Sequence, residues 1–194
     1  VQRLINMGVP VITSGLGRGV VPETDPMVLG AFTAVPLVEE YYKTVDLMIV
    51  AGSRMRAQET RDMSVELPAN RIHIDVDPTA NGRTYGSSLF HVGDAGAVLE
   101  AIADRVEGKL NTPQAYRDEV MQLKKDVHTE YKKTLGVYAD FAEQLREAMP
   151  DDAMFVRDIT KSHTTWGYRL FPILSPETNI LSLIHISEPT RHES

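Results

Sequence analysis

Short apolar stretches that end in glycine or aspartate recur along the first half of the chain. Residues 9–14 run into a glycine-rich loop, and residues 46–53 and 71–77 repeat the pattern of an apolar stretch followed by a small or acidic residue. A nearly continuous apolar run of this length, bounded by turn-forming residues, is typical of a strand buried on both faces. The pattern therefore predicts three strands of a buried sheet.

Helical patterns lie between and after these strands. One precedes the second strand at residues 37–42, and another, residues 95–106, has apolar side chains at helical spacing behind Asp94, which we expect to cap it. Strands that alternate with helices form parallel sheets. The predicted fold class is therefore α/β, with a Rossmann-like parallel sheet flanked by helices.

The chain becomes more polar and lacks strand-like apolar runs after Gly108, until about residue 153. Residues 114–134 are polar, charged and helical in spacing, a further helix is expected at about residues 138–148, and residues 153–160 again have the pattern of a strand. We predict four parts: a central nucleotide-binding domain truncated at its N-terminal end, a helical linker, the start of a second α/β domain, and a tail. Their residues are 1–107, 108–150, 151–180 and 181–194.

The tail differs from the rest of the chain. Residues 181–191 look like the translation of a sequencing adapter in one reading frame, and residues 192–194 would belong with them. We do not interpret the histidines of the tail as metal ligands. Because the chain also begins at Val1 without an initiator methionine, we expect it to be an incomplete piece of a longer protein.

Composition narrows the classes of function. Of the 194 residues, 42% are hydrophobic and 24% are charged, and no segment could span a membrane. The net charge of −7 argues against a nucleic-acid binder, because the phosphates would repel the protein. The absence of cysteine excludes disulfides and fits a cytoplasmic protein. A small-molecule partner is expected.

Glycines follow the first predicted strand at alternate positions. Gly15, Gly17 and Gly19 would let backbone amides approach an anionic ligand at the carboxyl edge of a parallel sheet. A loop that needs glycine for its turn explains them equally well. Arg18 could bind a phosphate, or it could be a solvated surface side chain.

Polar residues follow the other two strands. Residues 52–54, Gly-Ser-Arg, end one strand, and Asp75 and Asp77, at the end of the next, could accept hydrogen bonds from ribose hydroxyls. A proline follows Asp77, which is also a common way to open a turn. His73 alternates with isoleucines and is expected to be a core or edge residue rather than a catalyst, and His91 resembles it. These residues indicate a nucleotide crevice without a full G-x-G-x-x-G motif.

Motifs in a fixed order connect these separate signals. They are Pro-Val-Ile-Thr-Ser at 10–14, Gly-Arg-Gly-Val-Val-Pro-Glu at 17–23, Asp25-Pro26, Leu29-Gly30, residues 46–54, His-Ile-Asp-Val-Asp-Pro at 73–78, and Val92-Gly93-Asp94. The set resembles the middle domain of the thiamine-diphosphate enzymes related to acetolactate synthase, over roughly residues 1–107. Residues 155–160 and Trp166 resemble the opening strand and helix of that family's C-terminal domain.

The resemblance implies an FAD-type site in the middle domain. The matching positions are Ser14, Gly15, Leu16, Leu29, Gly30, Gly52, Ser53, Arg54, Asp75, Val76, Asp94 and Ala95. Two departures from the family pattern leave room for a relative without flavin. Residues 55–58 replace the acidic and basic residues that follow this motif in acetolactate synthases, and Phe32 stands where those enzymes tend to have histidine.

The resemblance also implies thiamine diphosphate in the second domain. The matching residues are Thr160, Lys161, Ser162 and His163, although the family's usual Gly-Gln-His-Gln is absent; hydroxyls and a cation could still bind phosphate oxygens. The implied chemistry is carbanion catalysis on a small-molecule 2-oxo acid.

Other implied parts of the enzyme lie outside this sequence. In the family, a glutamate of the N-terminal domain promotes catalysis, and a Gly-Asp-Gly and Asn motif binds Mg²⁺. The chain has neither, so we predict no catalytic residue in it and no activity for it alone. The family also implies a homodimer or homotetramer.

Three functions remain open. The first is an acetolactate-synthase-like carboligase with FAD, and the second is a 2-oxo acid decarboxylase of the benzoylformate type without FAD. The third is a non-catalytic nucleotide-binding module that shares only the sheet and its crevice.

Overall fold

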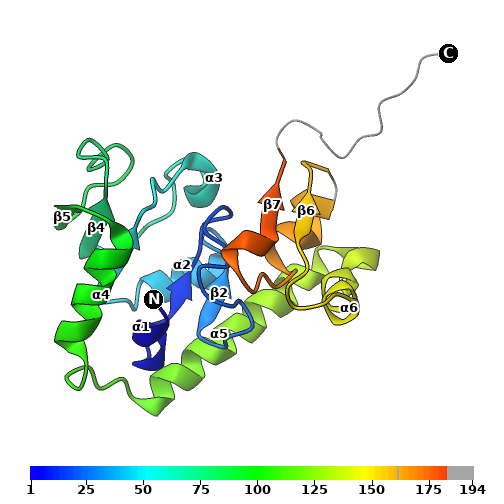
Figure 1. Cartoon of the computed structure of the whole chain (residues 1–194), viewed down its shortest axis with the longest axis horizontal. Coiled ribbons are helices and arrows are strands. Elements are labelled where there is room, and N and C mark those ends of the chain that lie inside the picture. Colours follow the sequence, from blue (N-terminus) through cyan, green and yellow to red (C-terminus); the bar gives the residue numbers. More distant parts are fainter. Residues whose placement is uncertain (161, 183–194) are drawn as a thin grey trace.

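The protein is seen here in a computed structural model that describes residues 1–160 and 162–182. Lys161 and residues 183–194, most of the predicted adapter tail, lie outside the described residues. Three small parallel sheets follow one another along the chain (Figure 1). The strands are β1 (Val11–Ile12) with β2 (Val28–Gly30), β3 (Met48–Ala51) with β4 (Arg71–Asp75) and β5 (Leu89–Val92), and β6 (Phe155–Arg157) with β7 (Asn179–Leu181).

Helices connect and cover these strands. They are α1 (Gln2–Asn6), α2 (Pro36–Tyr42), α3 (Ala57–Thr60), α4 (Ala95–Val106), α5 (Gln114–Lys133) and α6 (Phe141–Ala148), with the single turns η1 (Gly136–Tyr138), η2 (His163–Gly167) and η3 (Pro176–Thr178). Parallel strands flanked by helices confirm the α/β fold class. No helix in the described ranges has the length and apolar content needed to cross a membrane.

β3 and β4 lie within the strands predicted at residues 46–53 and 71–77. Val50 of β3 pairs with His73 of β4, and His73 pairs with Phe90 of β5. Asp94 caps α4 as expected, because its side chain accepts a hydrogen bond from Ala97 N at 2.8 Å.

β5 is a strand that the sequence pattern did not predict. It is an edge strand of its sheet, and Leu89 and Val92 are both more than half exposed. His91 is also exposed, which agrees with the edge alternative for this residue. The exposure arises because only the inner edge of β5 is paired within the described sheet.

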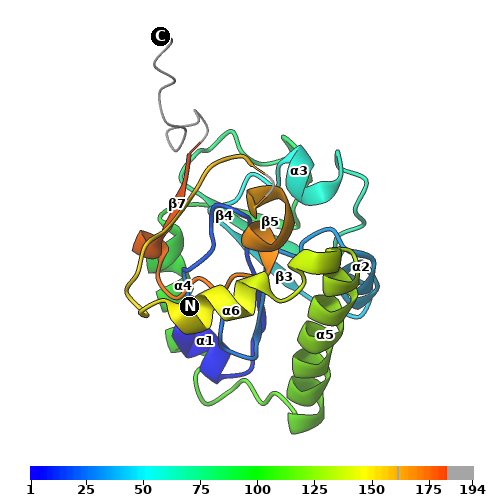
Figure 2. The ribbon, with the colours of Figure 1, turned by 90° about the vertical axis from the view of Figure 1, so that its right-hand side faces the viewer.

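α5 packs against the core along much of its length. Its Val120 and Val127 are buried in the same hydrophobic cluster as Val28 and Phe171, which belong to the first and last parts of the chain. Figure 2 shows α2 beside α5. This hydrophobic cluster therefore joins the first and last parts of the chain, and the domain boundaries drawn from sequence stay a prediction.

Phe32 connects β2 to this helix. Its ring is fully buried and lies 5.2 Å from the ring of His128 and 5.5 Å, edge to face, from that of Tyr131. Aromatic contacts of this kind stabilise a core beyond simple burial of area. The position where acetolactate synthases tend to have histidine is therefore a packing position in this chain.

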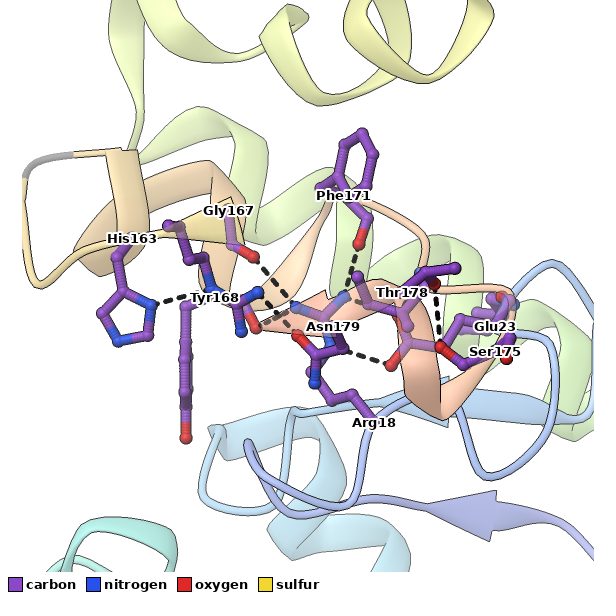
Figure 3. A network of polar contacts seen from close by, with 12 residues as sticks. Arg18, Glu23, His163, Gly167, Tyr168, Phe171, Ser175, Thr178 and Asn179 are labelled. Atoms are coloured by element: carbon purple, nitrogen blue, oxygen red, sulfur yellow. Dashed lines mark hydrogen bonds and ion pairs between the residues drawn. The ribbon is translucent and has the colours of Figure 1, made fainter. Parts of the chain in front are cut away.

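Arg18 joins the first part of the chain to the last. It is 1% exposed and forms a bidentate ion pair with Glu23. Its Nε donates to Oε1 of Glu23 at 2.8 Å and its Nη2 to Oε2 at 2.5 Å. The other three of its five N–H donors bind the backbone carbonyls of Gly167, at 2.9 Å, of Tyr168, at 2.7 Å, and of Phe171 (Figure 3). Arg18 is therefore a structural cation, and neither a phosphate ligand nor a solvated side chain.

We expect the Arg18→Met substitution to lower the free energy of unfolding by about 3–5 kcal/mol, because it leaves the Glu23 carboxylate buried without its partner. Urea unfolding followed by circular dichroism measures the loss. Arg18→Met with Glu23→Leu should recover part of it, since no charge is then left unpaired. Lys43→Met, which breaks the exposed pair with Glu40, is the control and should cost no more than about 1 kcal/mol. An equal effect of the single and double substitutions would contradict this account.

We also expect stability to fall in acid because of His128. Burial, followed by the nearby Lys124 and Lys132 ammonium groups, lowers the pKa of His128 to about 4. The unfolded chain binds this proton near the ordinary value of about 6.5, so the free energy of unfolding should decrease as pH falls from 6.5 to 4. His128→Phe keeps a ring against Phe32 and should show a smaller decrease. Urea midpoints of both proteins across this pH range provide the measurement, and parallel curves would exclude the assignment.

Candidate functional site

The ends of β3, β4 and β5 bring one group of predicted site residues together. Gly52 N donates to Ile74 O at 2.9 Å, and Gly93 N donates to Asp75 O at 3.0 Å. Gly52 has a positive φ of 60°, and a methyl group added to it would lie 3.8 Å from Cβ of Ala95. Gly52, Asp75 and Ala95 therefore meet at the carboxyl edge of this sheet, where open α/β sheets bind ligands.

His73 supports this edge from inside the sheet. It is 1% exposed, its Nε2 lies 3.1 Å from the Ser53 carbonyl oxygen, and its ring meets that of Phe90 edge to face. A carbonyl oxygen can only accept, so the imidazole proton is on Nε2. The expectation of a core histidine is confirmed, and the contact fixes the backbone of Ser53.

The carboxylates at this edge hold turns and a helix. Asp75 accepts a hydrogen bond from Asp77 N at 2.9 Å, and Asp94 caps α4. Asp77 accepts from both the hydroxyl, at 2.7 Å, and the backbone N–H, at 2.9 Å, of Thr79, which hold the pKa of that carboxyl below its usual range. The turn interpretation of Asp77 therefore has direct support.

The remaining residues of this group lie at its surface. The Ser53 hydroxyl accepts from Met55 N at 3.2 Å, and the Arg54 carbonyl accepts from the Thr84 hydroxyl at 2.9 Å. The side chains of Arg54 and Val76 are exposed. They could meet a ligand from solvent.

The loop after β1 forms a second group with β2. Thr13 N donates to Gly30 O at 3.1 Å, and the Ser14 hydroxyl accepts from Gly17 N at 3.0 Å. Leu29 and Gly30 are buried, whereas Leu16 is 62% exposed. Of the five predicted residues in this group, Leu16 is thus the most open to a ligand.

Tyr168 occupies the space beside Gly15. A methyl group added at Gly15 would lie 2.4 Å from Cε2 of Tyr168 and 2.5 Å from its hydroxyl oxygen. The ring also meets the imidazole of His163 edge to face, with centroids 5.2 Å apart (Figure 3). The Tyr168 ring therefore fills the space next to Gly15 that a side chain would take.

The loop after β6 gathers hydrogen-bonding groups. The hydroxyl oxygens of Thr160 and Ser162 are 2.9 Å apart, and Nδ1 of His163 accepts from Nε of Arg157 at 3.0 Å. Hydroxyls, an imidazole and a nearby cation are groups that bind phosphate oxygens, so the described residues of this loop fit a diphosphate.

Sequence reasoning missed Arg157 and Tyr168. The signal for Arg157 was a cation inside a short apolar strand, which a buried position can tolerate only with polar partners. Tyr168 gave no signal, because its contact with Gly15 joins residues far apart in the chain. A cavity of about 680 Å³ runs along α5, and none of the predicted site residues that the structure describes lines it.

Comparison with known proteins decides the family. The family described as "Thiamine pyrophosphate enzyme, central domain" matches residues 2–102, more than half of the 194 residues. The chain belongs to the thiamine pyrophosphate enzyme family. The resemblance that the motifs carried is therefore confirmed.

Individual relatives in this family share a quarter to a third of their residues with the chain. "Probable 2-ketoarginine decarboxylase AruI" of Pseudomonas aeruginosa is 26% identical over 84% of this chain and 29% of its own length. "Probable acetolactate synthase large subunit" of Methanocaldococcus jannaschii is 30% identical over 60% of this chain and 20% of its own. "Acetolactate synthase" of Mycobacterium avium is 26% identical over 88% of this chain and 29% of its own length. The chain thus spans less than a third of these relatives.

We expect Gly15→Ala to destabilise this family member by about 1–3 kcal/mol, because the added methyl group overlaps the Tyr168 ring. Tyr168→Ser should relieve the overlap, so the double variant should lose less than the sum of the single losses. Gly86→Ala is the control, since nothing lies within 4 Å of the position of its added methyl group. Thermal unfolding of the four proteins measures the coupling, and strict additivity would exclude the contact.

Proposed function

We propose that the chain is part of a thiamine-diphosphate-dependent enzyme that acts on a 2-oxo acid, as an acetolactate-synthase-like carboligase or a decarboxylase. The observation that carries this proposal is the family match over residues 2–102. The names of the relatives add a substrate class, since one is named for the decarboxylation of 2-ketoarginine, a 2-oxo acid, and others are named acetolactate synthase.

We propose roles for the residues after β6 from the hydroxyl and imidazole groups that they carry. Thr160 and Ser162 would bind phosphate oxygens through their hydroxyls, and His163 would donate from Nε2; Lys161, outside the described residues, is proposed for the same loop. When bound, thiamine diphosphate supplies the carbanion chemistry that removes carbon dioxide from a 2-oxo acid. The chain's own residues would hold the diphosphate in place.

Other parts of the proposed enzyme are absent from this sequence. No Gly-Asp-Gly motif occurs in the 194 residues, so the Mg²⁺ that links the diphosphate to the protein would be bound by residues elsewhere in a longer protein. We accordingly propose that the chain alone does not turn over a 2-oxo acid. A homodimer or homotetramer and a cytoplasmic location are proposed for the longer protein.

A second candidate is a 2-oxo acid decarboxylase without flavin. It is favoured by the Tyr168 ring beside Gly15, by Phe32 in the core, and by the carboxylates of Asp75 and Asp94, which already bind backbone N–H groups. The FAD-type residues would then bind no flavin, and the sheet edge would serve as structure.

We expect the longer protein that contains this chain to release carbon dioxide from pyruvate or another 2-oxo acid only when thiamine diphosphate and Mg²⁺ are present. Carbon dioxide release and analysis of the organic product separate the two candidates, because a carboligase joins two carbon skeletons and a decarboxylase gives the aldehyde. A flavin absorption band in the purified protein favours the first candidate. The 194-residue chain is the control and should be inactive; no cofactor-dependent turnover by the longer protein would contradict the proposal.

A further inference from the structure

Arg157, the last residue of β6, is a buried cation whose hydrogen-bond partners are neutral. Its side chain is 4% exposed, its Nε donates to Nδ1 of His163 at 3.0 Å, and its Nη1 donates to Oδ1 of Asn179 at 2.6 Å. Among the described residues, its Nη2 has no hydrogen-bond partner, and no carboxylate pairs with it. Burial, and then the charge of Arg18, lowers the pKa of Arg157 to about 10, so the side chain is still charged at neutral pH.

The contact with Arg157 determines where His163 carries its proton. Nε of arginine always bears a hydrogen, so Nδ1 of His163 must be the unprotonated acceptor, and the proton of the neutral ring is on Nε2. The edge-to-face contact with Tyr168 restricts the plane of the same ring. His163 therefore has both a defined tautomer and a defined orientation.

The surroundings also keep this ring neutral. A proton on Nδ1 would point at the N–H of Arg157, and two donors cannot share a hydrogen bond. The groups that face His163 are Arg157, the Tyr168 ring and, further away, Arg18, whose charge is paired with Glu23. Burial, then Arg157, then Arg18 lowers the pKa of His163.

We propose that Arg157 is a positioning residue that locks His163 as an Nε2–H donor to a phosphate oxygen of an anionic ligand, a diphosphate ester, bound by Thr160, Ser162 and His163. The diphosphate as the ligand rests on the proposed function. Arg157 itself is buried and acts through the histidine, while its positive charge adds a favourable electrostatic field for the anion. Asn179 of β7 accepts a hydrogen bond from the other end of the guanidinium, so β6 and β7 together fix the position of Nε of Arg157.

The first test is spectroscopic and uses the 194-residue chain labelled with ¹⁵N-histidine. Long-range ¹H–¹⁵N spectra report which ring nitrogen is protonated, and His163→Gln identifies the signals of His163. In the unmodified chain we expect a single Nε2–H tautomer from about pH 5.5 to 7.5. Arg157→Met should give a mixture of tautomers and move the pKa of His163 up toward its ordinary value of 6.5. Arg105→Met removes an exposed arginine from the last turn of α4 and should change neither.

Arg157→Lys keeps the inference testable if Arg157→Met does not fold. Lysine retains the buried charge but lacks the Nε–H donor, so the mixture of tautomers should appear while the pKa of His163 stays low. A protonated Nδ1 in the unmodified chain would overturn the inference. So would an unchanged tautomer and pKa of His163 in both variants.

The second test measures anion binding with inorganic pyrophosphate as the probe. Trp166, the one tryptophan in the sequence, lies in the same turn as His163, so its fluorescence should report binding. We expect Arg157→Met to weaken binding roughly tenfold at about pH 7.5, and the Kd of the variant to improve as pH falls and His163 becomes charged. The Kd of the unmodified chain and of Arg105→Met should change little over the same pH range.

The two tests separate this inference from the proposed function. If the unmodified chain fails to bind millimolar pyrophosphate, or if Arg157→Met and Arg105→Met weaken binding equally, the role of Arg157 is overturned whatever the longer protein does with thiamine diphosphate. If pyrophosphate binds as expected but the longer protein shows no thiamine-dependent turnover, the positioning role stands and the proposed function fails.

Discussion

The buried ion pair of Arg18 and Glu23 is the contact on which the rest of the structure depends. One guanidinium, placed by the glycine loop after β1, donates hydrogen bonds to three backbone carbonyls, one at the end of η2 and two in the residues that follow it. Glu23 completes the arrangement by accepting from Ile173 N at 2.9 Å. Two buried charges are costly to desolvate, and here every donor of the cation is used. The pair thereby fixes the turn that contains His163 relative to the first sheet.

Much of the fold could be predicted from sequence because it depends on local patterns. The apolar runs that became β3 and β4, the stripe of α4 and the cap at Asp94 are signals within a few residues. β2 has only three residues, Val28–Gly30, which is too short for a periodicity to appear. The exposure of β5 follows from its place at the edge of a sheet, and strand order is not written in any one segment.

In the candidate site too, residues marked by local patterns could be predicted, whereas residues that depend on long-range contacts could not. Residues at strand ends were identified because parallel strands end at one edge of a sheet, and the structure brings Gly52, Asp75 and Ala95 together there. Arg18 was misjudged, since the three carbonyls that it binds in addition to Glu23 are about 150 positions further along the chain. Tyr168 was missed for the same reason. Long-range contacts decide whether a polar residue of a loop binds a ligand or binds its own protein.

Tyr168 also lies between two groups of candidate site residues, the loop after β1 and the loop after β6. Its ring rests on Gly15 on one side and meets the imidazole of His163 on the other. A ligand that needs the space beside Gly15 must displace the ring, and the displaced ring no longer restrains His163. Occupancy of the two places is then thermodynamically linked, and the linkage is reciprocal: each ligand changes the affinity for the other by the same factor.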